Sequence, residues 1–439
     1  MKLVEFKGIY PKKKKETAGL DLVTMTPAQF YNVPLKVSGI PESVPCVKIG
    51  DEVKQGTLIA QPAGRVGINI FSPVSGKVLN IFSRLTSSGE MAKHILIMNN
   101  NKDEVENLPE IDSISDVVLI DRLRLAGVID TISSMPAYLK YAYTGSRSYR
   151  TLLIFLDSTD PNNTVNQTLT EFKMEEVVNG ARYFMNVTSA STITFVLTEA
   201  NYKLGTKLKK HIEETKKNYD FKIKYIPNKY PFENPHILAN LVCNKKINNK
   251  TSFLDSGISI ESAEACYNFC RAVEFNKPVT TNVITLDGDN VERKGNYIIQ
   301  NGVSFGSLLD FAGIVNKEAK SVLIDGGILA GKAQFNRDIS ISQLSNTIIF
   351  NKFDELTTRT ENPCISCGKC QKVCPMMLNP ARIDQAFLDE DIDELKQLDI
   401  HSCIDCGCCS YVCPAKRFLA QRIALAKFND KKSGGAVNG

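Results

Sequence analysis

The sequence predicts a multidomain α/β and α+β protein that ends in a small α-helical domain rich in cysteine. Three observations predict this class: a length of 439 residues, an alternation of strand-like and helix-like segments in the middle of the chain, and nine of the 13 cysteines gathered between Cys364 and Cys413. At roughly 150 residues per domain, this length corresponds to about two to four domains. Hydrophobic residues at 43% and charged residues at 23% are typical of a globular protein.

The composition also excludes several classes of protein. No apolar segment follows the first charged residues and no run of about 18 apolar residues occurs, so neither a secretory signal nor a membrane-spanning helix is predicted. The 53 Lys and Arg against 48 Asp and Glu are too balanced to indicate nucleic-acid binding. We expect a cytoplasmic protein, at most peripheral to the inner face of the cell membrane, whose clustered cysteines hold metal rather than disulfides.

The first 98 residues are predicted to contain a basic arm and a β domain. Residues 1–30 carry Lys12 to Lys15, which indicate either a solvated arm or a docking element for an acidic partner or membrane face. Residues 31–98 read as short strands joined by Gly-Asp and Ser-Gly turns. This pattern resembles the barrel-sandwich hybrid of lipoyl and biotinyl domains. It lacks the Met-Lys-Met that carries their swinging arm, so we expect a structural role.

Residues 115–240 are predicted to form a Rossmann-like α/β domain with a mostly parallel sheet, because helical and strand signals alternate there. The expected elements, in order, are a helix, a strand, a helix, a strand, a helix and a strand: Val117–Ala126, Leu152–Leu156, Met174–Met185, Thr192–Leu197, Leu204–Lys217 and Phe221–Ile226. Residues 255–350 are predicted to form a smaller α+β domain, with helices at Ala263–Val273 and Ser307–Ala312 and a strand at Val279–Leu286.

The strongest signal is a duplicated cysteine motif in a predicted domain at 355–420, which a tail at 421–439 follows. The first run extends from Cys364 to Pro375 and the second from Cys403 to Pro414. Both have the spacing C-x2-C-x2-C-x3-C-P, which is the bacterial spacing for [4Fe–4S] ligation. The apolar spacing between the runs, from Pro380 to Leu398, favours a helical two-cluster ferredoxin domain.

The same spacing predicts the ligands of two [4Fe–4S] clusters. In two-cluster ferredoxins the fourth cysteine of each run ligates the other cluster. We therefore assign Cys364, Cys367, Cys370 and Cys413 to cluster 1, and Cys403, Cys406, Cys409 and Cys374 to cluster 2. Zinc is the alternative, but a double four-cysteine run with a terminal Cys-Pro is a poor zinc pattern.

Five cysteines remain outside this assignment. Cys408 is expected to be an unligated neighbour of the clusters, with an alternative ligand as the second reading. Cys266 and Cys270 share a face of a predicted helix and are either a redox pair or, as we favour, small apolar core residues. Cys46 is a weak candidate for an exposed thiol, and Cys243 carries no signal.

The order of these parts resembles the RnfC/RsxC family, the NADH-oxidising peripheral subunits of the ion-translocating ferredoxin:NAD oxidoreductase. The resemblance covers nearly the whole chain and implies that residues 255–350 are an SLBB-like sheet domain. The segments that match the family are Val47–Ala60, Arg122–Gly127, Asn228–Pro231, Val279–Gly288, Gly295–Tyr297, Gly326–Gly327 and both cysteine runs.

Three elements of the family's flavin and nucleotide site are altered together. The Gly-Gly-Ala-Gly-Phe-Pro-Thr loop is replaced by the stretch from Gly127 to Ala137, which has lost the glycines that let a backbone approach phosphate. The family's acidic stretch reads Leu156 to Pro161 here, and its Gly-Gly-Glu is replaced by Phe232 to Pro235. We therefore expect that FMN is not bound and that NADH is not oxidised.

These departures predict an electron carrier, with no catalytic residue assigned. Within the family, the chain most resembles the PrdC group, the electron-transfer proteins associated with proline reductase in amino-acid-fermenting clostridia. This resemblance implies redox partners: a donor such as an Rnf complex or an NADH-linked reductase, and an acceptor such as D-proline reductase. Two alternatives stay open, namely an NADH-oxidising RnfC protein with a divergent flavin site, and a scaffold protein that docks on a membrane complex through Lys12 to Lys15.

Overall fold

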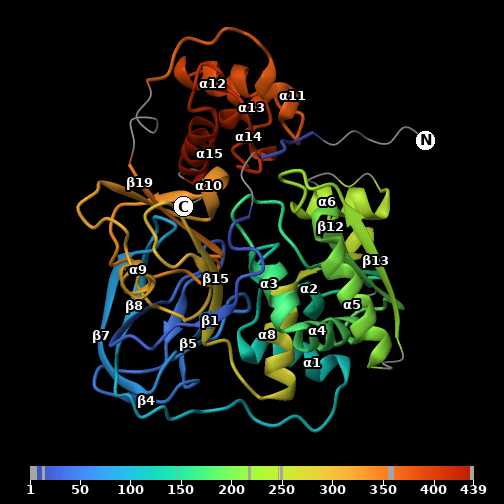
Figure 1. The fold of residues 1–439 in the computed structure, drawn as a ribbon, viewed down its shortest axis with the longest axis vertical. Helices are drawn as coiled ribbons and strands as arrows, with labels where there is room; N and C mark the ends of the chain where they lie inside the picture. Colours follow the sequence, from blue (N-terminus) through green and yellow to red (C-terminus); the bar gives the residue numbers. More distant parts are fainter. Residues whose placement is uncertain are drawn as a thin grey trace.

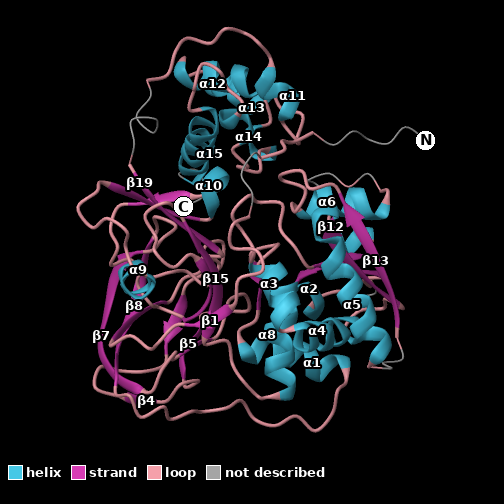
Figure 2. Ribbon diagram, in the orientation of Figure 1, coloured by secondary structure: helices cyan, strands magenta, loops and turns pink. Residues whose placement is uncertain are grey.

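The structure is a computed structural model that describes residues 7–11, 15–145, 147–215, 219–245, 247, 251–353 and 360–435, with side chains up to residue 430. Two large lobes lie side by side, and a small helical domain sits across one end of both (Figure 1). One lobe is mainly strands, the other is an α/β domain, and the small domain is helical (Figure 2). The predicted multidomain α/β architecture is therefore confirmed.

The N-terminal half of the strand-rich lobe is a barrel-sandwich domain of two antiparallel sheets. One sheet has the order β2 (Phe30–Pro34), β8 (Met91–Asn99), β7 (Gly76–Leu85) and β4 (Glu52–Val53). The other has the order β3 (Ser43–Pro45), β5 (Leu58–Pro62) and β6 (Ile70–Phe71). Alternate side chains of these strands fill a common core, which includes Tyr31, Ile59 and Ile95.

A six-stranded mixed sheet shares this core and completes the lobe. Its order is β1 (Leu22–Thr24), β16 (Gly295–Gln300), β15 (Thr281–Asp287), β19 (Thr347–Lys352), β17 (Ser321–Asp325) and β18 (Lys332–Gln334). Helix α9 (Phe305–Ala312) packs on it, and the short α10 (Gly327–Ala330) follows β17. The predicted strand and helix of this region are confirmed, whereas the finer SLBB-like label stays a prediction.

The second lobe is built on a parallel sheet with the order β13 (Asp220–Ile226), β12 (Thr192–Thr198), β11 (Thr151–Phe155) and β14 (Ile258–Ser262). Side chains of β11 alternate between two cores, so Leu152 and Ile154 face one core while Leu153 and Phe155 face the other. The first core is covered by α1 (Asp116–Ala126), α2 (Tyr138–Ala142), α3 (Val165–Phe172), α4 (Met174–Asn186), α5 (Tyr202–Glu214) and α8 (Ala263–Glu274).

The opposite face of this sheet is covered by α6 (Pro235–Cys243), with α7 (Phe253–Ser256) beside it. Helix α6 starts where Asn234 accepts backbone hydrogen bonds and proline occupies the first turn, a common helix start. The short hairpin of β9 (Ile129–Asp130) and β10 (Met135–Pro136) follows α1. All six elements expected in 115–240 are present, but β14 and α8 also join this lobe, although α8 was predicted to belong to the following domain.

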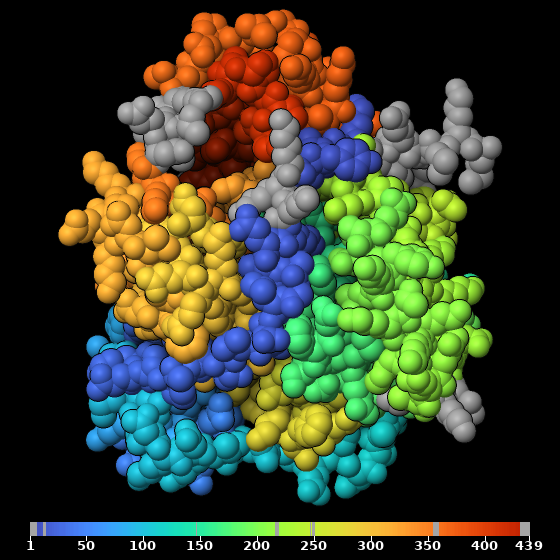
Figure 3. Space-filling model, viewed as in Figure 1, coloured from blue at the N-terminus to red at the C-terminus, as the bar shows by residue number. Residues whose placement is uncertain are grey.

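The N-terminal residues depart from the expected solvated arm. Strand β1 pairs in parallel with β16, so residues 22–24 belong to the six-stranded sheet. Lys15 is not solvated, because its ammonium lies 3.1 Å from the buried carboxylate of Asp157; Lys12 to Lys14 lie outside the described residues. Figure 3 shows the described N-terminal residues, in blue, lying across the seam between the two lobes.

The C-terminal domain is helical, as the spacing predicted. Its helices are α11 (Lys369–Val373), α12 (Pro380–Leu388), α13 (Ile392–Gln397), α14 (Cys408–Tyr411) and α15 (Leu419–Gly435). Ile383, Leu395 and Ile423 form its small core. The predicted tail at 421–439 is instead mostly helix α15, which packs this core through Ile423 and Ala426. None of the described helices is long and apolar enough to span a membrane.

Candidate functional site

The two cysteine runs form the same backbone loop twice. Each cysteine of the first run has an equivalent 39 residues later, from the pair Cys364 and Cys403 onward. Ser366 and Asp405, which are equivalent, share a left-handed backbone with φ of 53°. The following glycines at equivalent positions, Gly368 and Gly407, are also left-handed, with φ of 66° and 73°. Turns of this kind aim successive backbone N–H groups inward and favour a bound anion.

A cavity of about 480 Å³ lies at the first run and is lined by four cysteines. Three belong to the first run, Cys364, Cys367 and Cys370, and the fourth is Cys413 of the second run. Cys364 and Cys367 are exposed at its rim, whereas Cys370 is buried. These four are the residues assigned to cluster 1 from the sequence.

The thiols assigned to cluster 2 are also neighbours. Burial raises the pKa of Cys409, and the nearby Cys406, Cys403 and Cys374 raise it further. Cys374 therefore lies among the thiols of the second run, just as Cys413 lies among those of the first. Burial also raises the pKa of Cys403, to about 12. Since iron binds the thiolate, coordination must offset this cost.

Backbone N–H groups donate hydrogen bonds to these sulfurs. Those of Gln371 and Ala381 lower the pKa of Cys370 against the effect of burial, and those of Met376 and Leu378 do the same for Cys374. Hydrogen bonds to sulfur are one of the means by which a protein sets cluster potential. The loops therefore offer both soft ligands and N–H donors.

The donor set fits a cluster better than a single ion. Among the described residues, no group of three or more His, Cys, Asp or Glu side chains is positioned to hold one metal ion. A cubane is bound at its corners, so its four thiolates stand further apart than the ligands of one zinc ion. The cavity between the four thiols of the first set provides that space.

The second run is packed against the rest of the molecule. Ile404 joins the core formed by Phe155, Phe232 and α6 of the α/β domain. The side chain of Cys408 is fully buried against Ile9 and Tyr230, and its sulfur lies 4.0 Å from the Tyr230 carbonyl oxygen. Cys408 also donates a hydrogen bond to Cys406, which lowers the pKa of Cys406. The residue that the sequence predicts to be an unligated neighbour therefore lies beside a predicted ligand.

The second run also closes a crevice at the carboxyl edge of the parallel sheet. The strand order places β12 and β14 on opposite sides of β11, and such reversals create ligand-binding crevices in α/β sheets. A cavity of about 240 Å³ lies there, lined by Phe155, Ser158, Glu233 and Cys406. Burial raises the pKa of Glu233, whose carboxylate accepts hydrogen bonds from Ser158 and Thr159. In the sequence, the segment from Phe232 to Pro235, which contains Glu233, stands out only because it departs from the RnfC pattern.

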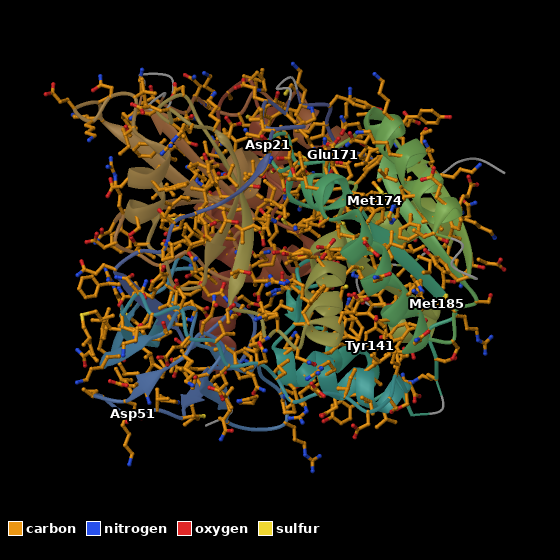
Figure 4. The ribbon with its side chains drawn as sticks, turned by 60° about the horizontal axis from the view of Figure 1, so that its bottom comes forward. Asp21, Asp51, Tyr141, Glu171, Met174 and Met185 are labelled. Carbon is orange, nitrogen blue, oxygen red and sulfur yellow. The ribbon has the colours of Figure 1, made fainter. Side chains whose placement is uncertain are left out.

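The stretch that replaces the family's glycine loop forms the hairpin β9–β10, and a buried ionic network lies behind it. The Lys140 ammonium lies 2.6 Å from Asp130 and 2.9 Å from Glu261, both fully buried. Burial alone lowers the pKa of Lys140, but the two carboxylates outweigh it and hold the pKa above its ordinary value. The Tyr141 hydroxyl donates a hydrogen bond to Glu261 at 2.6 Å. Figure 4 shows Tyr141 in the α/β lobe, well separated from Asp51 on the barrel.

The remaining four cysteines do not line either of the cavities at the two runs. Cys266 and Cys270 are fully buried in α8, and Cys266 packs in the core beneath the sheet. Cys46 is exposed and Cys243 is half-buried. No disulfide links any of the 13 cysteines, all of which are described.

Three family models match successive parts of the chain. The RnfC barrel-sandwich hybrid domain matches residues 5–102, the Nuo51 FMN-binding domain matches residues 125–286, and the 4Fe-4S dicluster domain matches residues 357–414. These segments overlap the barrel, the α/β lobe and the helical domain, respectively.

The chain is also similar to subunits of proton- and ion-translocating oxidoreductase complexes. It is 27% identical over 370 residues to the C subunit of the proton-translocating ferredoxin:NAD(+) oxidoreductase complex of Clostridium ljungdahlii, covering 80% of each chain. It is 26% identical to the C subunits of the ion-translocating oxidoreductase complexes of Citrobacter koseri and Salmonella gallinarum, covering 86% of this chain in both cases. The chain spans only 54% and 56% of those two longer relatives.

Among solved structures, the fold resembles that of a chain of the NAD+-reducing [NiFe]-hydrogenase in the H2-reduced state. The TM-score is 0.53 at 11% identity, over 71% of this chain and 60% of the other. At this identity the likeness concerns the fold alone.

Together, the fold and the cysteine loops define an iron–sulfur electron-transfer protein of multidomain architecture. The three models and the relatives from ion-translocating complexes support an RnfC-like family, as the sequence indicated. The match to the FMN-binding domain does not support the expectation that FMN is absent. Closeness to the PrdC group stays a prediction.

Proposed function

We propose that this chain carries electrons through two [4Fe–4S] clusters. Cluster 1 is held by Cys364, Cys367, Cys370 and Cys413, and cluster 2 by Cys403, Cys406, Cys409 and Cys374. The observation that carries the proposal is the cavity at the first run, which is walled by three thiols of that run and by Cys413 of the other. The exchange of the fourth cysteine between runs is the arrangement of two-cluster ferredoxins.

Each bound cluster supplies one-electron redox chemistry, and the protein sets where and how readily that happens. Backbone N–H groups at Gln371 and Met376 reach the sulfurs, and burial differs between the two sites. Both factors influence cluster potential. Gln371 acts on cluster 1 through Cys370 and Met376 acts on cluster 2 through Cys374, so each cluster has its own N–H donor.

The partners we propose follow from the resemblance to the PrdC group. The donor is an Rnf complex or an NADH-linked reductase, and the acceptor is a reductase such as D-proline reductase. The altered flavin motifs support a carrier that receives electrons from a separate flavoprotein. In this scheme the chain acts in the cytoplasm or at the inner face of the membrane.

The crevice beside cluster 2 fits FMN poorly. Its volume of about 240 Å³ is below the roughly 300–1,000 Å³ of typical ligand pockets. The carboxylate of Glu233 lines it, which disfavours a phosphate group. The nearby Lys140 is already engaged by Asp130, Glu261 and the Ile260 carbonyl, so it is not free to bind one.

The match to the FMN-binding domain favours a second candidate function. In it, the chain is the NADH-oxidising peripheral subunit of an ion-translocating ferredoxin:NAD oxidoreductase, with a divergent flavin site. The position of the crevice supports this candidate, because Cys406 forms one of its walls and a cofactor there would adjoin cluster 2.

Anaerobic reconstitution of the full chain with iron, sulfide and FMN distinguishes the two candidates. The carrier proposal expects about eight iron atoms per chain, cluster reduction by dithionite, no flavin absorbance after desalting and no bleaching by NADH. Retained flavin together with NADH-dependent bleaching would establish the second candidate. A chain that binds no iron would overturn both.

A further inference from the structure

The internal repeat allows the surroundings of the two clusters to be compared residue by residue. Ile365 in the first run is equivalent to Ile404 in the second. Ile404 packs into the core of the α/β domain, whereas 66% of Ile365 is exposed to solvent. The same apolar side chain, on the same loop, is therefore packed into a core at cluster 2 and mostly exposed at cluster 1.

The glycine of each loop shows the same difference. A Cβ atom added to Gly407 would lie 2.1 Å from the carbonyl oxygen of Leu329, so the second loop is in close contact with the strand-rich lobe. A Cβ atom added to Gly368 would meet nothing within 4 Å among the described residues. The second loop is thus packed against both lobes, whereas the first loop is open at Ile365 and Gly368.

One position differs in chemistry as well as in exposure. Cys408, fully buried against Tyr230, is equivalent to Lys369, which is exposed. A small apolar thiol suits a permanent contact within one chain. An exposed lysine beside an exposed isoleucine suits a contact with a separate, negatively charged protein, because transient interfaces combine an apolar centre with complementary charge.

We propose that the first run is the docking surface for a separate acidic redox protein, which contacts Ile365 and Lys369 much as the two lobes contact the second run. This inference rests on the proposed electron-carrier function and adds the exit point and the charge of the partner. Cluster 2 is then the inner cluster, next to the crevice, and cluster 1 is the outer one.

The charges around the first cavity fit an acidic partner. The residues that line it include Lys369, Arg382 and Arg417, and none of the lining residues is acidic. Arg382 pairs with Glu394 and Arg417 pairs with Asp384, but Lys369 makes no ion pair among the described residues. Lys369 is therefore the unpaired cationic side chain of this rim among the described residues. The exposed Cys364 and Cys367 bring the edge of cluster 1 to the same surface.

The test is electron transfer from the reconstituted, dithionite-reduced full chain to two acceptors of opposite charge, followed by stopped-flow absorbance. The acceptors are a small acidic [2Fe–2S] ferredoxin and the cationic cytochrome c. The test variant is Lys369→Glu. The control is Lys210→Glu, which makes the same charge reversal at a side chain on α5 that is 75% exposed, forms a surface ion pair with Glu214, and is far along the chain from both runs.

We expect Lys369→Glu to slow reduction of the ferredoxin about tenfold at low salt and to speed reduction of cytochrome c, with both effects lost near 0.5 M salt, because electrostatic steering is screened. Lys210→Glu should stay within about twofold of the parent for both acceptors. The opposite directions matter, since a mere change in cluster potential would shift both rates in the same direction.

A second variant, Ile365→Ala, tests the apolar part of the surface. It should slow reduction of the ferredoxin even at high salt, by roughly threefold to tenfold, because the lost contact is not electrostatic. Rates for Lys369→Glu and Ile365→Ala that equal those of Lys210→Glu would overturn the docking surface. A parent chain that reduces neither acceptor, although its clusters are present and reduced, would instead overturn the proposed function.

Discussion

The two cysteine runs have the same spacing and the same left-handed turns, yet three pairs of equivalent residues in them have different surroundings. The second run is packed against both lobes through Ile404, Gly407 and Cys408. The first run presents the equivalent Ile365, Gly368 and Lys369 outward. The repeated residues set the ligand geometry, so they make the two sites alike. The surroundings then make one site internal and the other external.

The largest effect is expected from removing one ligand of each set. Cys367→Ser should abolish cluster 1 and Cys406→Ser should abolish cluster 2, each lowering the iron content from about eight to about four atoms per chain. Iron analysis and the EPR signals of the reduced protein measure this. If both EPR signals survive unchanged in either variant, the ligand assignment is wrong.

A smaller but clear difference is expected between the two glycines. Both Gly368→Ala and Gly407→Ala place a Cβ on a left-handed backbone, which costs about 1–2 kcal/mol. Only Gly407→Ala also forces a contact with the Leu329 carbonyl, so its total cost should be roughly 3 kcal/mol or more. Urea concentrations at which cluster absorbance is lost give the comparison. Equal midpoints for the two variants would contradict the packing of the second run.

The two isoleucines should differ in the same direction by a smaller amount. Ile404→Ala removes a side chain from the core against the α/β domain and should cost about 1–2 kcal/mol, less than a fully buried isoleucine because Ile404 is half-buried. Ile365→Ala removes an exposed side chain and should cost less than about 0.5 kcal/mol. The same urea titration measures both, and a larger loss for Ile365→Ala would reverse the inner and outer assignment.

The smallest expected effect concerns cluster potential. Cys408→Ala removes a hydrogen bond to Cys406 that favours the more negative, reduced state of cluster 2. At about 1 kcal/mol, its loss should lower the potential of cluster 2 by roughly 40 mV and leave cluster 1 unchanged. An anaerobic redox titration followed by EPR resolves this. An equal shift at both clusters would show that the effect is not local.

Local patterns made much of this protein predictable from sequence. The cysteine spacing predicts the loops, and the alternation of strands and helices predicts the α/β lobe, because both depend on residues close in the chain. The ion pair of Lys15 with Asp157, the addition of β14 beside β11 and the packing of Ile404 were not predicted. Each of these contacts joins residues that are far apart in the sequence. A run of lysines or a single isoleucine does not indicate which distant residue it will contact. The sequence did contain one signal that the surroundings of the two clusters differ: the 39-residue repeat has Lys369 in the first copy and Cys408 at the equivalent position of the second.

The most direct test of the inner and outer assignment uses chains that hold one cluster each. After reduction by dithionite, the Cys406→Ser chain, with cluster 1 alone, should reduce the acidic ferredoxin at close to the parent rate. The Cys367→Ser chain, with cluster 2 alone, should be at least about tenfold slower, because its remaining cluster lies against the lobes. Equal rates from the two chains, or a faster rate from cluster 2 alone, would contradict the assignment of cluster 1 as the outer cluster.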